Sequence, residues 1–573
     1  MLLTRLLLFS IFLFNMLFPV NNDKELFISP VKIPLLLSAN FGELRVDHFH
    51  SGIDIKTQGV TGKEVLAADN GYVYRISVTP GGFGNALYIK HPSGYSTVYG
   101  HLSRFRPDIA EYVRSHQYSG KSFTITLFPP VDMFPVKQGD LVAYSGNTGS
   151  SGGPHLHFEI RKSAGEKPLN PLRFKFNITD NIPPVIEKIT VYPLSDHTLV
   201  NGRNQMKMIT VSGGHGNYYI PSDKVLTIDG PAGFGIKSFD LLNGSHNRCA
   251  AYSIDLSIDS TRIFRYSMDG FSFSESRYVN SHIDYATYQK DNVHYERTFV
   301  LPNDRFDAYS NLVNRGIFNF EDKQIHKVRI TVSDAYNNKS VLSFKIRAGN
   351  GKASSNASFH GRYTKVMPYE NINRFTDDGI YVAIPAGALY DTLYFYYNRL
   401  PGSQGMLSDL FSVHNRFTPV QKAYNLSIKP NRIPAGKKSK MLIIELDDRK
   451  NKHAVSSRWS GSYLSADVYT FGDYFIGMDT IPPEISAHGL HNGANLSNKS
   501  NIRFRITDDL SGIKSYEPLI DGKWALFEYD LKNNQIIYRF DKERIKKGTN
   551  HTLNLTVTDN CDNVSSYKCD FIW

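Results

Sequence analysis

The sequence is poor in cysteine, which excludes a whole class of small folds. Only three cysteines occur among 573 residues, and no C-x-x-C pair is present. A disulfide-dense scaffold and a zinc site built on a C-x-x-C pair are therefore excluded. Cys561 and Cys569 could pair across a hairpin near the end of the sequence, and free thiols agree with their spacing at least as well.

The sequence also lacks any basic run, and it has no long apolar stretch after its first twenty residues. Its 65 Lys and Arg residues are scattered, so nucleic-acid binding has little support. The formal net charge of +11 suits an anionic polymer such as the cell wall, and solubility alone explains it equally well. A second membrane-spanning segment is not expected.

The N-terminal segment is the one strongly apolar part of the sequence. Arg5 precedes an apolar run over residues 6–20, and polar residues follow from Asn21. A short charged start and an apolar run of this length are typical of a secretory signal. Because no clear A-x-A cleavage site follows, an uncleaved anchor is the alternative. We therefore predict a signal peptide or anchor over residues 1–22 and an exported protein of the periplasm or cell envelope.

What the sequence does contain favours β structure. Aromatic residues make up 13% of it, with 34 Tyr and 36 Phe, and Thr, Ser and Asn are frequent. A hydrophobic content of 41% and a charged content of 21% are typical of folded proteins. Because the length exceeds what one hydrophobic core normally supports, we expect a mostly β protein of about three or four domains.

Candidate chemistry gathers around a glycine-rich turn that leads into a strand. Residues 149–160 read GSSGGPHLHFEI, and the pattern predicts a strand over residues 156–160. His155 and His157 then share one face, because successive strand side chains point to opposite faces. Two adjacent imidazoles can bind a metal, but H-x-H alone is weak evidence, because two polar residues on the solvated face of a strand explain it better.

A second pair of metal-binding side chains precedes this strand. His50 and Asp54 form an H-x-x-x-D pattern, and the intervening Gly52 lets the backbone curve so that both can reach one ion. A neutral imidazole and a carboxylate are a normal zinc pair. The alternative is an Asp that only holds a His by a hydrogen bond.

Short strand-like pieces separated by turn residues connect the two pairs, which indicates an antiparallel sheet. A short helix is predicted over residues 107–117, with Pro107 in its first turn and Ile109 and Val113 on one face. The strands are expected at residues 64–67, 71–76, 86–91 and 95–101.

These motifs occur in a familiar order. H-x-x-x-D, then Y-G-H-L, then G-x-x-G-x-x-G-G-P-H-L-H-F resemble the lysostaphin/LytM-type zinc endopeptidases over roughly residues 38–165. The resemblance implies a small antiparallel β-sheet that floors a groove walled by loops. It also implies an enzyme that cuts peptide bonds in peptidoglycan.

Carried over residue by residue, the resemblance implies one Zn²⁺ ion held by His50, Asp54 and His157. His101 and His155 would be the two histidines beside the metal that do not bind it. Three protein ligands leave a fourth position open, as in a catalytic zinc site. Imidazole can exchange a proton near neutrality and stabilise an oxyanion, so His101 and His155 are the candidate catalytic residues. Which of them is the general base stays open.

Side chains next to these motifs allow weaker interpretations. Glu159 shares a strand face with His157 and either orients a ligand or is solvated. Tyr99 shares a face with His101 by the same spacing and could line the groove. Asn147 and Thr148 could contact substrate, although loop polarity explains them equally well. His48, His91 and His116 are interpreted as non-ligands.

The part of the sequence after residue 175 has no comparable cluster, but it repeats a module. A D-x-I-P-P entry at Asp180 recurs at Asp479, and a D-x-x-x-N turn at Asp334 recurs at Asp559. A G-I-K-S segment at residue 235 is echoed at residue 512. The pattern predicts immunoglobulin-like β-sandwiches. The Asp and Asn of the turns are expected to cap the backbone, with a calcium site as the alternative.

We therefore predict a mostly β, exported zinc metalloendopeptidase that acts on peptidoglycan stems or cross-links. The predicted units are residues 23–175 (peptidase), 176–352 (immunoglobulin-like), 353–478 (β-rich, role not readable, after a linker at about 349–358) and 479–573 (immunoglobulin-like). Residues 23–175 are expected to fold alone. The β modules could contact the wall or an envelope protein. The alternatives are a catalytically silent wall-binding or regulatory protein and a wall adhesin.

Overall fold

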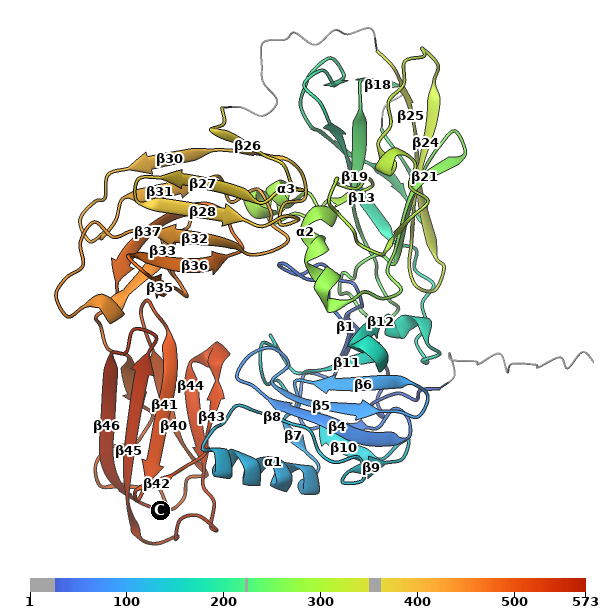
Figure 1. The fold of residues 1–573 in the computed structure, drawn as a ribbon. Coiled ribbons are helices and arrows are strands. Elements are labelled where there is room, and N and C mark those ends of the chain that lie inside the picture. Colours follow the sequence, from blue (N-terminus) through green and yellow to red (C-terminus); the bar gives the residue numbers. More distant parts are fainter. Residues whose placement is uncertain (1–25, 222–224, 350–361) are drawn as a thin grey trace, which may run out of the picture.

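The computed structural model describes residues 26–221, 225–349 and 362–573. The predicted signal peptide lies outside the described residues, as does nearly all of the predicted linker. Figure 1 shows mainly strands, gathered in separate bodies around an open ring, which confirms the expected β class. No helix within the three described ranges is long and apolar enough to span a membrane.

The first body is an antiparallel sheet with one helix beside it (Figure 1). Its main sheet has the order β1-β2-β11-β6-β5-β4-β8. These strands are β1 (Leu37–Ala39), β2 (Ile53–Lys56), β11 (His155–Lys162), β6 (Tyr95–Gly100), β5 (Asn85–Lys90), β4 (Gly71–Val78) and β8 (Ile125–Leu127), with β12 (Lys167–Leu169) on β11 and β9 (Pro135–Val136) on β4. A smaller sheet joins β3 (Glu64–Leu66), β10 (Leu141–Tyr144) and β7 (Arg104–Phe105).

The predicted helix is present as α1 (Pro107–Gly120). It begins with proline, which cannot continue a helical hydrogen-bond ladder on its N-terminal side but fits the first turn. Ile109 and Val113 are buried, as their spacing indicates, and the helix ends at Lys121 in the left-handed conformation. The strand predicted over residues 156–160 is longer than expected, and Leu156 and Phe158 pack in the core beneath it.

The second body is a two-sheet sandwich. One sheet has the order β15 (Lys207–Thr210), β13 (Val185–Pro193), β19 (Ala232–Phe239), β22 (Glu296–Arg297). The other has the order β14 (Leu199–Val200), β18 (Leu226–Asp229), β25 (Lys339–Arg347), β24 (His326–Ser333), β20 (Ser253–Ile258), β21 (Thr261–Ser267), β23 (Tyr309–Ser310), and β16 (Ser212–Gly214) and β17 (Asn217–Tyr219) extend it. The short helices α2 (Val279–His282) and α3 (Tyr285–Asp291) lie between β21 and β22 in the chain.

The third and fourth bodies are also two-sheet sandwiches. In the third body, one sheet has the order β27 (Asn373–Asp377), β28 (Ile380–Ile384), β32 (Tyr424–Ile428), β36 (Tyr463–Val468), β35 (Arg458–Ser460). The other has the order β30 (Tyr397–Leu400), β31 (Leu410–Val413), β37 (Gly472–Met478), β33 (Met441–Leu446), β34 (Lys452–Val455). A separate two-stranded ribbon consists of β26 (Lys365–Met367) and β29 (Leu393–Phe395). The fourth pairs β38 (Glu484–Ala487), β40 (Asn501–Thr507), β44 (Gln535–Arg539) and β43 (Phe527–Asp530) with β39 (Ala494–Asn495), β46 (Val564–Ile572), β45 (Asn550–Asp559), β41 (Ile513–Ile520) and β42 (Lys523–Trp524).

The second and fourth bodies repeat one turn in detail. In the second body, Asp334 accepts hydrogen bonds from the backbone N–H groups of Tyr336 (2.8 Å) and Asn338 (2.9 Å). In the fourth, Asp559 accepts equivalent bonds from Cys561 and Asn563, both at 2.8 Å. These aspartates therefore cap the backbone, as expected.

The G-I-K-S echo, however, does not mark equivalent strands. Gly235 lies on β19, which pairs with the entry strand β13. Gly512, its apparent counterpart in the fourth body, directly precedes β41, which pairs with β45, the strand before the last. The true counterpart of β19 is β40, because β40 pairs with the entry strand β38. The four-residue match therefore does not mark equivalent positions in the two bodies.

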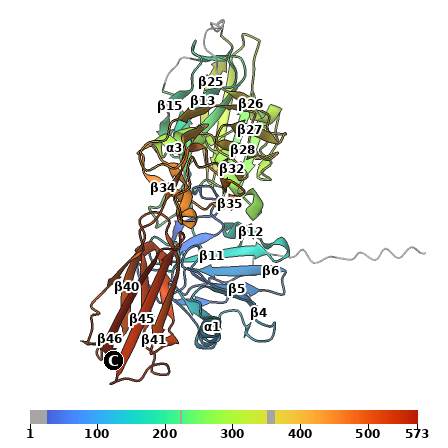
Figure 2. The ribbon, with the colours of Figure 1, turned by 60° about the vertical axis from the view of Figure 1, so that its left-hand side comes forward.

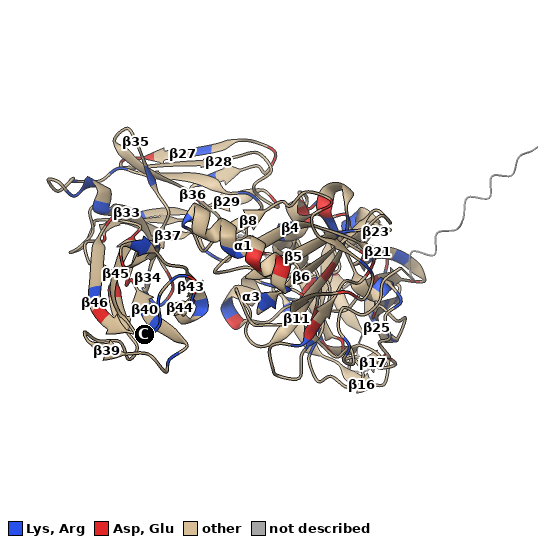
Figure 3. Ribbon diagram, turned by 90° about the horizontal axis from the view of Figure 1, so that it is seen from below, with Lys and Arg blue, Asp and Glu red and all other residues tan. Residues whose placement is uncertain are grey.

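The three cysteines are buried and unpaired. Cys569 lies in the core of the fourth body, whereas Cys561 packs against Leu442, Ile444 and Phe475 of the third body, so the two do not bridge the terminal hairpin. Basic and acidic residues are interspersed along the visible elements instead of gathering on one body (Figure 3).

The first two bodies share hydrophobic contacts. Phe41 and Phe49 lie between β1 and β2 of the first body but are buried in the core of the second body. Phe49 stacks on Phe306 with a centroid distance of 4.9 Å, and its N–H donates to the Ser276 hydroxyl. In return, Ala335 of the second body packs into the core of the first. Residues from both sides of the expected domain boundary near residue 175 therefore contribute to one apolar interface.

A fragment of residues 23–175 is consequently expected to be poorly stable. Exposing two buried Phe rings costs about 3–6 kcal/mol at about 1.5–3 kcal/mol each, against a net domain stability of about 5–15 kcal/mol. A fragment of residues 23–349 keeps the interface and serves as the control. Thermal melting by circular dichroism should show a lower midpoint for the short fragment. Equal midpoints would show that the shared contacts are dispensable.

Candidate metal centre

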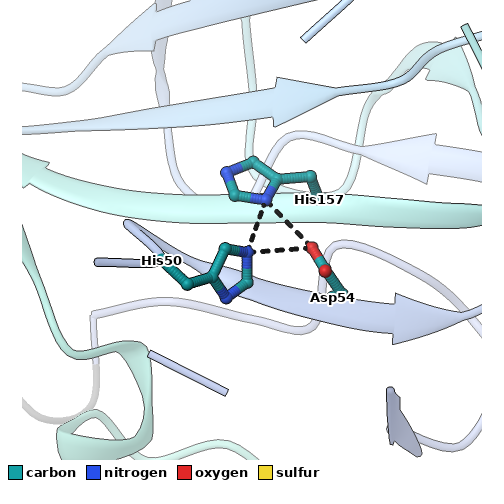
Figure 4. Close-up of side chains that lie close together, drawn as sticks. All are labelled: His50, Asp54 and His157. Atoms are coloured by element: carbon teal, nitrogen blue, oxygen red, sulfur yellow. Dashed lines mark hydrogen bonds and ion pairs between the residues drawn. The ribbon is translucent and has the colours of Figure 1, made fainter. Parts of the chain in front are cut away.

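Three of the predicted site residues converge on one point. The Nε2 atom of His50 lies 3.1 Å from Oδ1 of Asp54 and 3.1 Å from Nδ1 of His157, and this Nδ1 lies 3.0 Å from the same Oδ1 (Figure 4). All three residues are at least 91% buried. Asp54 on β2 and His157 on β11 are direct partners in the antiparallel register, so the sheet itself aligns them.

Gly52 leaves room for β11 and the His157 ring beside the backbone at this point. Its φ angle is not in the left-handed region, so special backbone curvature is not required here. A Cβ atom on Gly52 would instead lie 2.5 Å from the carbonyl oxygen of Phe158 and 2.9 Å from the His157 ring. The glycine is needed because β11 and the imidazole approach the backbone closely.

The hydrogen bonds of the two imidazoles show what the point between them can bind. Nδ1 of His50 lies 2.7 Å from the carbonyl oxygen of Asn40, and Nε2 of His157 lies 2.9 Å from Oε1 of Glu159. Both partners can only accept when Glu159 is ionised, so these nitrogens carry the hydrogens. In the neutral forms that metal binding requires, the two rings then present lone pairs at the facing nitrogens, together with a carboxylate oxygen. Donors about 2.0–2.1 Å from a tetrahedral zinc lie about 3.3–3.4 Å apart, so the group fits such an ion.

His101 and His155 lie beside this group. Their ring centroids are 4.7 Å apart, and Nε2 of His155 lies 3.4 Å from Oδ1 of Asp54. Nδ1 of His101 donates to the carbonyl oxygen of Thr148, and Nδ1 of His155 to that of Gly153, each at 2.8 Å. Both Nε2 atoms are therefore left with lone pairs. Burial, followed by the neighbouring His157 and His155, lowers the pKa of His101 to about 3, which keeps this ring neutral.

The same segment matches known proteins. Peptidase family M23 matches residues 48–125 and 134–171. A segment of 116 residues is 32% identical to Lipoprotein NlpD of Yersinia enterocolitica and covers 20% of this chain and 93% of that protein. The chain belongs to peptidase family M23. This confirms the resemblance to the lysostaphin/LytM-type enzymes, and residues 48–171 are called the M23 region below.

Two further comparisons each cover a quarter of the chain or less. The DD-carboxypeptidase/endopeptidase Mpg of Neisseria meningitidis serogroup B is 33% identical over 123 residues, which cover 22% of each protein. The crystal structure of a mutant catalytic domain of the prophage-encoded M23 protein EnpA from Enterococcus faecalis is 27% identical, with a TM-score of 0.19, and covers 25% of this chain and 95% of that one. The chain spans about a fifth of the length of the first curated relatives that it matches. Residues 364–479, the third body, match a Zu5-like domain.

Glu159 fixes the orientation of His157 in the M23 region. Its side chain is fully buried, it accepts from Nε2 of His157, and its other oxygen accepts from Nε of Arg161 at 2.5 Å. Burial opposes its ionisation, but the Arg161 guanidinium and His157 lower its pKa to about 2. Of the two interpretations of Glu159, the structure thus supports the orienting role over the solvated one.

We expect Glu159→Gln to weaken zinc binding about 10- to 100-fold, since carboxylates that orient a ligating histidine commonly contribute that much. Competition with a chromogenic chelator measures the change. Glu166→Gln is the matched control, because Glu166 also contacts Arg161 but does not contact His157. Equal zinc affinity in the two variants would show that the hydrogen bond to His157 does not matter.

Tyr99 does not line the site, contrary to the expectation. Its side chain is fully buried in the core, and its hydroxyl accepts from the backbone N–H of Ala68. The alternation that relates Tyr99 to His101 fails because β6 ends at Gly100 and His101 has a φ of 58°. His48, His91 and His116 lie outside the metal group, as expected.

The sequence pattern did not indicate that backbone carbonyl groups orient the histidines of the site. Thr148 contacts His101 through its main chain, while its hydroxyl donates to the carbonyl oxygen of Leu102 within the protein. Phe83 stacks on His157 with a centroid distance of 4.7 Å. Any residue type supplies a carbonyl, so the identities of Asn40, Thr148 and Gly153 carry little signal for this role.

The fourth body reaches the rim of the site. The Nζ atom of Lys532, at the tip of the β43–β44 hairpin, donates to the carbonyl oxygens of Asn147 and Ser151. This loop leads directly to His155. Other parts of the fourth body contact α1, where Arg114 pairs with Asp541 at 3.0 Å and Tyr118 contacts Trp524 edge-on at 5.4 Å. Figures 1 and 2 both show the last body beside the first.

Proposed function

We propose that the M23 region is a zinc endopeptidase that hydrolyses peptide bonds in the stems or cross-links of peptidoglycan. The observation that carries the proposal is the completeness of the site. His50, Asp54 and His157 meet at one point, and His101 and His155 stand beside it with free Nε2 lone pairs. A protein that only binds the wall has no need for this set of side chains.

His50, Asp54 and His157 would hold the metal through Nε2, Oδ1 and Nδ1. Zinc bound there would supply a Lewis acid that polarises a scissile carbonyl and activates a water molecule. The mixed set of two imidazoles and one carboxylate suits zinc better than a hard cation such as magnesium, which prefers oxygen ligands.

His101 and His155 would handle protons and negative charge. The neutral ring of His101 can accept a proton at Nε2, because its Nδ1–H is held by the Thr148 carbonyl. His155 is held in the same tautomer by Gly153 and can donate to a developing oxyanion once protonated. Both rings are oriented by main-chain atoms, so they need no reorganisation during the reaction.

The relatives support the substrate class. The Neisseria relative, 33% identical over 123 residues, is named a DD-carboxypeptidase/endopeptidase. The NlpD relative is named only as a lipoprotein. A catalytically silent wall-binding or regulatory protein therefore remains the alternative proposal. Both names fit an exported protein of the cell envelope, and the β modules are proposed to contact the wall or an envelope protein.

Digestion of purified peptidoglycan by the full protein tests this function. Mass spectrometry of the released material should show peptides cut at stem or cross-link bonds, which also identifies the bond. A chelator should abolish the release, and added zinc should restore it. Zinc-loaded protein that binds the wall but releases no peptide would contradict the proposal and favour the silent alternative.

A further inference from the structure

A second group of metal-binding side chains lies at the joint between the M23 region and the second body. Asp180 precedes β13, Asp240 follows β19, and Asp334 follows β24. One oxygen of each carboxylate lies within 4.8 Å of the other two. No imidazole or thiol of the described residues belongs to this group. An all-carboxylate set is typical of calcium and magnesium sites and not of zinc sites.

Hydrogen bonding leaves this group incompletely satisfied. Asp240 is 2% exposed, and its Oδ1 atom has no hydrogen-bond partner among the described residues. The same is true of the buried Oδ2 atom of Asp180. A buried carboxylate oxygen without a partner is costly, because burial removes the water that would otherwise solvate it. Each of these oxygens is therefore satisfied either by a proton held on the carboxyl groups or by a bound cation.

The charges around these carboxylates also favour a bound cation. Burial, followed by the charges of Asp334 and Asp180, raises the pKa of Asp240 to about 8. No Lys, Arg or His is among the causes of the raised pKa values of these three carboxylates in the described part of the chain. Three neighbouring carboxylates without a counter-charge must either keep protons or bind a cation.

The fourth body provides an internal comparison. Asp479 precedes the entry strand β38, Asp508 follows β40, and Asp559 lies at the capped turn. These positions match those of Asp180, Asp240 and Asp334 in the second body. Asp508 is only half-buried, and its Oδ2 accepts from the backbone N–H groups of Gly512 (2.7 Å) and Leu510 (3.2 Å). Asp479 accepts from Ser511. Oδ1 of Asp508 also lacks a hydrogen-bond partner among the described residues, and backbone N–H groups cap Asp334 in the first group as well. The two groups therefore differ in burial, since Asp240 is 2% exposed and Asp508 is half-buried.

We propose that Asp180, Asp240 and Asp334 bind a calcium ion that stabilises the joint between the M23 region and the second body. The position supports this role, because residues next to the site pack into the first body. Ala335 and Leu242 belong to the hydrophobic core of that body. The three carboxylates come from the segment before β13 and from the ends of β19 and β24. An ion bound to all three would fix these segments relative to one another.

Calcium titration of the full protein tests the proposal. The protein is dialysed into calcium-free buffer at mildly alkaline pH without a chelator, so that the zinc site is not stripped. Calorimetry with CaCl₂ should give a dissociation constant between about 10⁻⁵ and 10⁻³ M, the range of moderate protein sites. Added calcium should raise the melting temperature by at least about 2 °C. MgCl₂ should bind more weakly, because magnesium demands a stricter octahedral geometry.

Two variants locate the site. Asp240→Asn should weaken calcium binding at least about tenfold and lose the rise in melting temperature. In calcium-free buffer the same variant should melt no lower than the wild type, because the substitution removes repulsion between carboxylates. Asp508→Asn, at the matching position of the fourth body, should keep the full response. Asp180→Asn, at a half-exposed position, replaces Asp240→Asn if the latter does not fold.

Three results would overturn the assignment. Absence of both heat and thermal shift with calcium would show that the carboxylates share protons instead. Binding of magnesium without calcium would refute the choice of ion. Loss of the response in Asp508→Asn, with retention in Asp240→Asn, would place the ion in the fourth body.

Discussion

His50→Ala, Asp54→Ala and His157→Ala will each lose bound zinc and peptidase activity together. The three donor atoms lie 3.0–3.1 Å from one another, so each removal leaves two ligands around the same point. Two protein ligands hold zinc poorly. Zinc content by inductively coupled plasma mass spectrometry and release of wall peptides measure the two losses, and activity is expected to fall below detection.

His48→Ala is the matched control for this series. His48 is exposed and lies two residues before His50, so the substitution removes an imidazole from the same segment without touching the metal group. It should keep zinc and activity. A ligand variant that kept stoichiometric zinc would remove that residue from the metal site. A variant that lost zinc but kept activity would refute zinc catalysis.

His101→Ala and His155→Ala should keep zinc but lose a factor of about 10²–10⁴ in kcat, the usual size of acid–base assistance. The reason is geometric: both rings are oriented toward the metal group by backbone carbonyls, yet neither belongs to the triangle of donor atoms. The loss should fall on kcat more than on KM, because the rings stabilise the reaction more than they bind the peptide.

The pH profile separates a proton-transfer role from a structural one. Loss of a proton-transferring histidine should remove one limb of the bell-shaped dependence of kcat/KM on pH, whereas a misfolded site would lower the whole curve. Zinc loss in His155→Ala with retention in His157→Ala would exchange their roles. This outcome is a real test, because Nε2 of His155 lies only 3.4 Å from Oδ1 of Asp54.

The contact of the fourth body with the rim bears on how substrate reaches these groups. Lys532 holds the loop of Asn147 and Ser151, and this loop carries the carbonyl that orients His101. The fourth body is thus linked to the site by hydrogen bonds although it supplies none of the five predicted site residues.

Local pattern was sufficient for the parts of the site that lie on one strand or one turn. Alternation along β11 places His155 and His157 on one face and Leu156 and Phe158 in the core, because strand side chains alternate strictly. The glycine-flanked motifs also indicate which histidines and which aspartate belong together. Where the backbone leaves the regular strand, as at His101, the same reasoning fails and misplaces Tyr99.

Only the tertiary structure shows the contacts between segments far apart in the sequence. Phe49 directly precedes the predicted ligand His50, and its ring packs on Phe306 of the second body. Lys532 reaches a loop 385 residues earlier. The carboxylates of Asp180, Asp240 and Asp334 meet because three separate turns lie at the same end of one sandwich. Periodicity describes a residue's own strand, whereas these contacts depend on how two folded surfaces fit together, and no local pattern encodes that fit.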